Sequence, residues 1–143
     1  MMVFIVVESI MIAGVTLFQF NKKNSEYHEG RLERKENNLL VDIKYELQKN
    51  GINSINSLNN SMILEMADVH NLEFELYSLE GVLLKSSTAL TGVRGTTILD
   101  KEILEYFKND NSSRYVIEDK NSSYFKSSYN LVSNFQNQPL GII

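Results

Sequence analysis

The fold of this chain is decided by residues 72–87, LEFELYSLEGVLLKSS. In the first half of this stretch every second side chain is apolar, which is the period of a strand with one buried face. The alternating residues are Leu72, Glu73, Phe74, Glu75, Leu76 and Tyr77. Glu80 and Gly81 supply a turn, and residues 82–87 form the returning strand. The stretch therefore predicts a β-hairpin.

Downstream of the hairpin, the pattern predicts one helix and three further strands. Residues 100–109 place Ile103, Leu104 and Phe107 on one helical face. Residues 114–119, 124–133 and 140–143 then predict strands joined by polar turns, the last of them cut short by the end of the chain. The expected class is α+β, with a five-stranded, mainly antiparallel sheet that carries helices on one face.

Upstream of the hairpin, Ser25–Lys49 predicts one long helix that ends at Asn50 and Gly51. Its first half is polar, as expected of a solvated stalk. Its second half carries Leu40, Ile43 and Leu47 at the spacing of a buried stripe, which indicates that this half docks on the domain. A short helix is expected over Ser61–Val69, with Ser61 as its N-cap. The expected organisation is a membrane segment over 1–20, a stalk helix over 21–49 and one small folded domain over 50–143.

Residues 1–20, MMVFIVVESIMIAGVTLFQF, are apolar except for Glu8 and short polar side chains. Twenty helical residues span roughly 30 Å, the thickness of a bilayer core. The segment favours an uncleaved membrane anchor over a signal peptide, because it lacks a basic start and a small-residue cleavage site. A soluble helix is the third alternative. Lys22 and Lys23 follow the span, so the positive-inside rule taken alone places the domain in the cytoplasm, and basic residues upstream would reverse this orientation.

Composition narrows the class of function. The net charge of −4 argues against nucleic acid as a partner, and the absence of cysteine excludes disulfides and thiolate chemistry. The serine pairs at 86–87, 112–113 and 122–123 lack a partnering base, so no catalytic residue is expected. His28 is interpreted as an exposed stalk residue and His70 as a helix-end residue that caps carbonyl groups. Because these two histidines are far apart in the chain, neither a metal nor another cofactor is expected.

One loop and several tyrosines are candidates for ligand binding. Residues 92–97, GVRGTT, combine two glycines with Arg94 and two threonines, which suits either an anion cradle or a plain flexible turn. A small-molecule pocket between the sheet and its covering loop and helix would combine apolar walls with few polar groups. Its candidate lining residues are Tyr77, Arg94, Tyr115, Ser127 and Tyr129.

Three stretches carry a resemblance to a known family. They are FQFNKKNSEYHEGRLERKENNLL, from the end of the span into the long charged helix, DVHNLEFELYSLEGVLLKSS over the hairpin, and YFKSSYNLVSNFQNQPLGII at the end. Together they resemble the PAS-like extracytoplasmic (Cache-type) sensor domain of bacterial membrane-bound sensor histidine kinases. The resemblance implies that the chain is the input region of a two-component kinase. The catalytic core of that kinase would lie outside this chain.

The resemblance further implies a domain outside the cytoplasm, tethered to the cell membrane. Its partners would be membrane lipid, a second copy in a homodimer and a small-molecule ligand. Alternatives from the same residues are the sensor region of a chemoreceptor or of a cyclic-dinucleotide enzyme. A membrane-anchored interaction module without a ligand also remains open.

Overall fold

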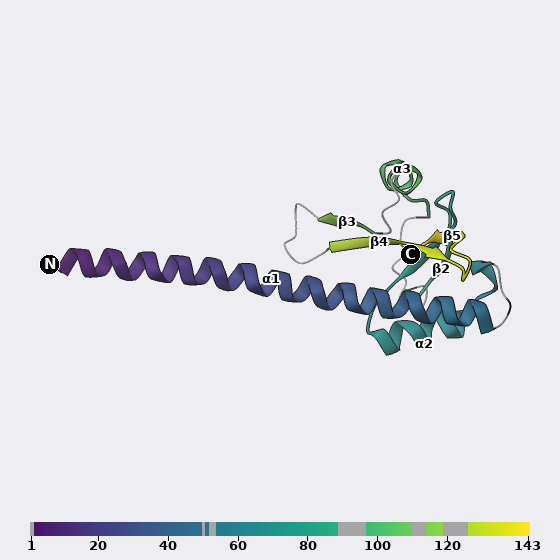
Figure 1. Cartoon of the computed structure of the whole chain (residues 1–143), viewed down its shortest axis with the longest axis horizontal. Helices are drawn as coiled ribbons and strands as arrows, with labels where there is room; N and C mark the ends of the chain where they lie inside the picture. The colour runs from purple at the N-terminus through teal and green to yellow at the C-terminus, as the bar shows by residue number, and fades with distance from the viewer. Residues whose placement is uncertain (1, 50, 52–53, 89–96, 110–113, 119–125) are drawn as a thin grey trace. The chain divides into compact units, whose positions relative to one another are not determined.

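The computed structural model describes residues 2–49, 51, 54–88, 97–109, 114–118 and 126–143. The chain divides into two compact units, Met1–Asn37 and Asn38–Ile143. Helix α1, Met2–Lys49, supplies the whole described part of the first unit and the first element of the second (Figure 1).

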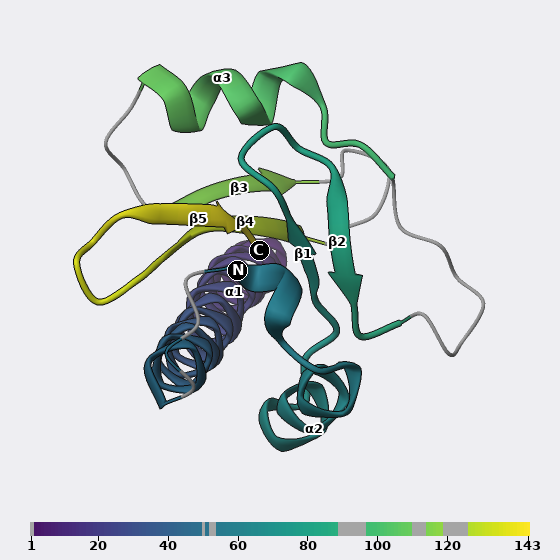
Figure 2. The same cartoon turned by 90° about the vertical axis from the view of Figure 1, so that its right-hand side faces the viewer.

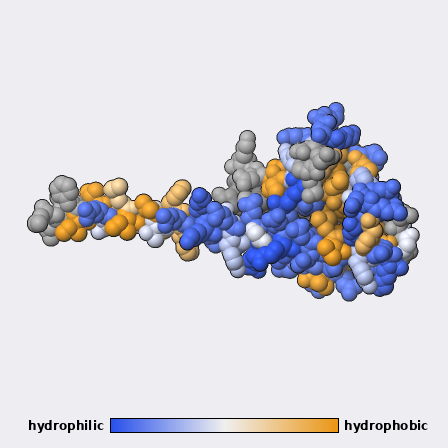
Figure 3. Space-filling view, in the orientation of Figure 1, coloured by the Kyte–Doolittle hydropathy of each residue, from blue (hydrophilic) through white to orange (hydrophobic). Residues whose placement is uncertain are grey.

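The first unit is helical and apolar at its N-terminal end (Figure 3). Side chains from Ile5 to Phe20 are exposed, with Ile10 at 65% and Phe18 at 72%. The hydroxyls of Ser9 and Thr16 donate to backbone carbonyls one turn earlier, at 2.8 and 2.7 Å, so their polar groups are satisfied inside the helix. By length and composition this helix can cross a membrane, a property that signal sequences near an N-terminus share.

The second unit is built on a five-stranded sheet in the order β2-β1-β5-β4-β3 (Figures 1 and 2). Every pairing is antiparallel, which confirms the predicted α+β class. The C-terminal strand β5 lies between the first hairpin and β4, so it joins the two halves of the sheet. The strands are β1 Glu75–Tyr77, β2 Leu83–Ser86, β3 Arg114–Glu118, β4 Lys126–Ser133 and β5 Pro139–Ile142.

The predicted hairpin is confirmed. Strands β1 and β2 pair with Glu75 opposite Ser86 and Leu76 opposite Lys85. The turn is closed by the Ser78 amide, which donates to the Val82 carbonyl at 2.8 Å. Gly81 has a φ of 85°, which a residue with a Cβ rarely adopts, so a glycine fits this position of the turn.

The helices lie on both faces of the sheet, which corrects the expectation of helices on one face (Figure 2). Helix α2, Asn60–His70, and the part of α1 from Asn38 onward pack with Leu76 and Val132 on one face. Helix α3, Lys101–Asn109, packs with their chain neighbours Tyr77 and Leu131 on the other. Because successive strand residues point to opposite faces, this alternation assigns the two faces unambiguously.

The face under α1 and α2 holds a mainly aliphatic core, which we call the aliphatic face although it includes Phe74 and Met66. Ile43 and Leu47 of α1 are 0% and 1% exposed, as the predicted stripe requires. The third buried apolar residue of α1 is Leu39 rather than Leu40, which is half-buried at the edge of the same cluster. Leu39, Ile43 and Leu47 follow an i, i+4, i+8 spacing, which the predicted i, i+3, i+7 stripe misplaced by one residue at its start.

Helix α2 begins one residue earlier than predicted and has a different cap. The Asn59 side chain, not Ser61, is the N-cap, and its Oδ1 accepts a hydrogen bond from the Ser61 amide at 3.2 Å. At the other end Asn71 adopts a left-handed conformation with a φ of 49°, which ends the helix. A single 3-10 turn, η1 Ile55–Ser57, connects α1 to α2 and buries Ile55.

Candidate functional site

Three of the predicted ligand residues meet on the face of the sheet that α3 covers. Tyr77 of β1, Tyr115 of β3 and Tyr129 of β4 all pack around one small apolar cluster. Tyr115 and Tyr129 are direct cross-strand partners, and Tyr77 lies opposite Ile142 in the central strand. We call Tyr77, Tyr115 and Tyr129 the tyrosine face. The strand alternation positions all three rings, so their convergence follows from the register of the sheet.

Helix α3 contributes to this face through its first and second turns. The Tyr115 hydroxyl donates to the Glu102 carboxylate at 3.1 Å, and its ring centroid lies 4.5 Å from that of Tyr106. The Tyr106 hydroxyl in turn donates to the Arg114 carbonyl at 3.1 Å. The hydrogen bond from Tyr115 to Glu102 raises the pKa of the Tyr115 phenol above its usual value.

A chain of polar groups runs from Tyr77 to the edge of the sheet. The Tyr77 side chain is 3% exposed, and its hydroxyl donates to Glu75 at 2.5 Å. The other oxygen of Glu75 accepts from Ser86 at 3.4 Å, and Ser86 lies 2.8 Å from the Thr88 hydroxyl. Glu75 is therefore half-buried among hydrogen-bond partners.

Tyr129 lies near carboxylates from two different elements, Glu75 of β1 and Asp100 just before α3. Burial raises the pKa of its phenol, and the nearby carboxylate charges of Asp100 and Glu75 raise it further. A hydrogen bond with the Ser127 side chain acts in the opposite direction. The predicted residue Ser127 thus contacts the tyrosine face through Tyr129, although its own side chain is exposed.

Arg94 and the predicted anion cradle lie outside the described residues, apart from Thr97 at the end of the loop. The Thr97 carbonyl accepts a hydrogen bond from the Leu83 amide at 3.1 Å, and Val82 forms a bridge with Ile98. The segment after the loop therefore returns to the outer edge of β2.

The sequence did not identify the three carboxylates that surround the tyrosines. Glu75, Asp100 and Glu102 come from β1, from the residue before α3 and from the first turn of α3. For Glu75 the sequence held one clue: it lies two residues before Tyr77, and residues two apart on a strand share a face. Asp100 and Glu102 are brought to the sheet by tertiary packing of α3.

The two histidines have different surroundings. The His28 ring lies edge-on to its neighbour Tyr27 with centroids 5.9 Å apart. His70 lies at the end of α2, as predicted, and its Nε2 is 2.7 Å from the Asp42 carboxylate of α1. Because Asp42 belongs to α1 and His70 to α2, this contact links the two helices, whereas the sequence predicted a cap on carbonyl groups. The His70 side chain is 11% exposed.

The polar groups of the tyrosine face are phenol hydroxyls and carboxylates, which bind small molecules reversibly in other proteins. Phenols that keep their protons donate hydrogen bonds, and the carboxylates between them accept hydrogen bonds or attract positive charge. Aromatic faces beside carboxylates also favour organic cations. In the structure the hydroxyls of Tyr77 and Tyr115 already donate to Glu75 and Glu102, so the donors and acceptors of this face are paired with one another.

Comparisons with protein-family models, with curated proteins and with solved structures yield no match for this chain.

Proposed function

We propose that this chain is the signal-sensing input region of a bacterial two-component sensor histidine kinase. In this proposal the apolar start of α1 is anchored in the cell membrane and the second unit lies outside the cytoplasm. The chain has no catalytic role of its own and acts as a homodimer. A ligand on the tyrosine face changes how α1 docks on the sheet, and α1 transmits the change to the membrane segment.

The observation that carries the proposal is the composition of α1. One uninterrupted helix contains an exposed apolar segment near its start and a fully buried stripe near its end. Ile43 and Leu47 belong to the larger of the two apolar clusters among the described residues, so a change in the sheet that displaces these side chains also displaces α1. A helix with these two ends suits the conversion of a binding event into a small translation or rotation.

The tyrosine face supports the ligand part of the proposal. Its groups come from β1, β3, β4 and α3, so a bound molecule would bridge both halves of the sheet. The central strand β5 pairs with both halves, and its Ile142 belongs to the same apolar cluster as Tyr77 and as Ile103 of α3. A ligand that pulls these strands together therefore acts on the same sheet against which α1 packs on the opposite face.

Membrane topology is the first test. The chain has no cysteine, so a single Lys101→Cys substitution at the exposed start of α3 gives one labelling site. Intact bacteria that express the variant are treated with a membrane-impermeant maleimide. The proposal expects labelling without permeabilisation. Labelling only after permeabilisation would place the domain in the cytoplasm and contradict an extracytoplasmic sensor.

Ligand binding is the second test. The full chain in nanodiscs is screened by thermal shift against small amines, amino acids and carboxylates. A molecule that binds only the folded domain raises its melting temperature, by an amount that grows with concentration. Tyr115→Phe should reduce that shift, whereas Tyr45→Phe on α1 should not. A complete screen without a shift would favour the alternative of an interaction module without a ligand.

A further inference from the structure

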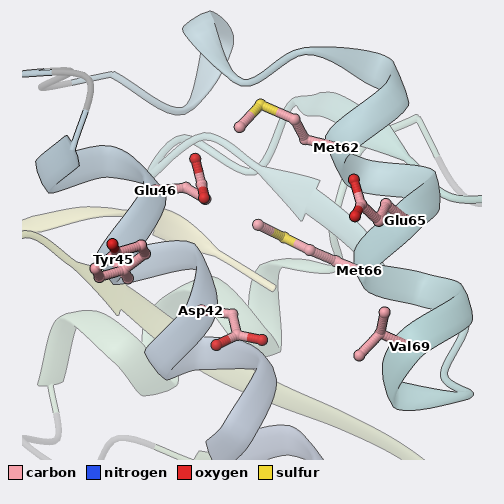
Figure 4. Close-up of a pocket in the computed structure, with 7 residues that line it drawn as sticks. All are labelled: Asp42, Tyr45, Glu46, Met62, Glu65, Met66 and Val69. Carbon is pink, nitrogen blue, oxygen red and sulfur yellow. The ribbon is translucent and has the colours of Figure 1, made fainter.

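A groove lies between α1 and α2, on the side of the domain away from α3, with a volume of about 300 Å3 (Figure 4). Residues from both helices line it: Asp42, Tyr45, Glu46, Met62, Glu65, Met66 and Val69. Met62 and Met66 extend from α2 toward α1, and Asp42 extends from α1 toward α2 (Figure 4). We infer that this groove binds a basic amphipathic helix of a partner protein.

The apolar part of the groove has the spacing of a helix-packing surface. Met62, Met66 and Val69 follow one another at i, i+4 and i+7 along α2. Met66 is 8% exposed and belongs to the core, whereas Val69 is 71% exposed, so the stripe continues from the core out to solvent. Tyr45 on the α1 wall is 57% exposed. Flexible thioethers adapt to the shape of an incoming side chain, as they do in other helix-binding grooves.

The polar part of the groove is acidic. Asp42, Glu46 and Glu65 line it, and no lysine or arginine is among its lining residues. Glu46 has Lys49 as a basic neighbour, whose ammonium lies 4.0 Å from the Glu46 carboxylate and whose side chain is 60% exposed. Asp42 is also engaged, because it pairs with His70 at one end of the groove. This distribution of charge is complementary to lysine and arginine side chains.

A helix suits the groove better than a small cation. A small cation would satisfy carboxylates but would leave Val69 and Tyr45 exposed. An amphipathic helix covers both kinds of surface, because its apolar ridge enters between two helices while basic residues on its flanks meet the acids. The partner would then contact the outer side of the same turns of α1 whose inner side holds Ile43 and Leu47. The groove thus gives the domain a second input, independent of any ligand on the tyrosine face.

Binding is tested with two designed helical peptides that share one leucine stripe. One peptide carries lysines on both flanks, and its matched control carries glutamates. The full chain is held in nanodiscs of zwitterionic lipid, and empty nanodiscs measure peptide that binds lipid. We expect the basic peptide to bind at least tenfold more tightly than the acidic one, and to weaken as salt is added.

Location in the groove is read from methionine methyl groups labelled with 13C. Met62 and Met66 resonances should shift on addition of the basic peptide, and that of Met11 should not. Glu65→Lys, an exposed change in the groove, should weaken binding about tenfold. Glu105→Lys, an equally exposed charge reversal on α3, should leave binding unchanged. Circular dichroism establishes that both variants are folded.

Three outcomes would overturn the inference. Equal affinity for the two peptides would remove the role of charge, and no binding of either would remove the docking surface itself. A third is binding of spermine, a small polycation, at the same methyl groups and with the affinity of the basic peptide. That result would replace the partner helix by a small-cation site.

Discussion

The two faces of the sheet differ in chemistry although the same strands build both. The face under α1 and α2 is aliphatic, and its central residues Ile43, Leu47 and Leu76 are at most 1% exposed. The face under α3 holds Tyr77, Tyr115 and Tyr129 beside carboxylates. Among its described residues the buried apolar cluster is small: Tyr77, Leu99, Ile103 and Ile142. A dry, close-packed face fixes the fold, whereas a polar and less enclosed face leaves groups for recognition.

The largest expected effect comes from truncation on the aliphatic face. Ile43→Ala removes methyl groups at a site with 0% exposure, and we expect the free energy of unfolding to fall by about 4 kcal/mol. Ile103→Ala on α3, at 2% exposure, should cost only about 2 kcal/mol because its half-buried neighbours can close the cavity. Urea denaturation of the full chain in detergent measures both. A larger loss for Ile103→Ala would contradict the conclusion that the face under α1 and α2 is the more tightly packed of the two.

Gly141 tests how tightly the central strand is packed on the aliphatic face. A Cβ at this position would collide with the Tyr77 carbonyl of β1 and with the Ile55 side chain. Because one of these atoms is backbone, Gly141→Ala should cost about 2 kcal/mol of stability, measured by the same denaturation. The matched control is Gly30→Ala in α1, where nothing lies within 4 Å of the new Cβ. That control should retain the wild-type stability or exceed it by up to about 1 kcal/mol.

Tyr77→Phe probes the polar chain on the other face. The substitution removes the hydroxyl that donates to Glu75 and leaves that carboxylate with Ser86 at 3.4 Å. We expect a loss of about 1 kcal/mol in the free energy of unfolding. Tyr45→Phe, on an exposed ring of α1, should change stability by less than about 0.5 kcal/mol. Equal effects of the two substitutions would show that the buried hydroxyl contributes nothing specific.

The smallest expected effect is a dependence of stability on alkaline pH. The pKa of Tyr129 is raised in the folded state, so the unfolded chain loses this phenolic proton first as the pH rises. The contribution of Tyr129 is therefore complete below the ordinary tyrosine pKa of about 10 and is lost between that value and the folded pKa. Melting temperatures recorded across this interval should decline less steeply for Tyr129→Phe than for the wild type. An unchanged slope would mean that Tyr129 is ordinarily solvated.

The order of the elements could be predicted from local patterns because it depends on neighbouring residues. The alternation over 72–77 and the turn at Glu80 and Gly81 specify a hairpin wherever the chain places it. The predicted bounds of α3 and β3 agree with the observed Lys101–Asn109 and Arg114–Glu118 to about one residue. Ile43 and Leu47 were found for the same reason, since a helical stripe repeats within one element.

Other features could not be predicted, because they depend on contacts between distant elements. Leu39 is buried and Leu40 only half-buried because of the angle at which the sheet meets α1. A helical period in the sequence does not specify that angle to one residue. The cap at Asn59 displaced the equally suitable Ser61, since local propensities of the two are nearly equal. The link from His70 to Asp42 joins residues 28 positions apart and has no sequence signal.

The sequence by itself determined an apolar N-terminal helix, a long helix with a buried end and an antiparallel α+β domain. These features follow from hydrophobic periods of two or 3.6 residues, and such periods depend only on residues that are close together in the chain. Only the tertiary structure decided that α3 lies opposite α1 and α2, that β5 is central, and that three tyrosines from three strands converge. The physical reason is that a strand has two faces, and its own residues do not state which element will cover each of them.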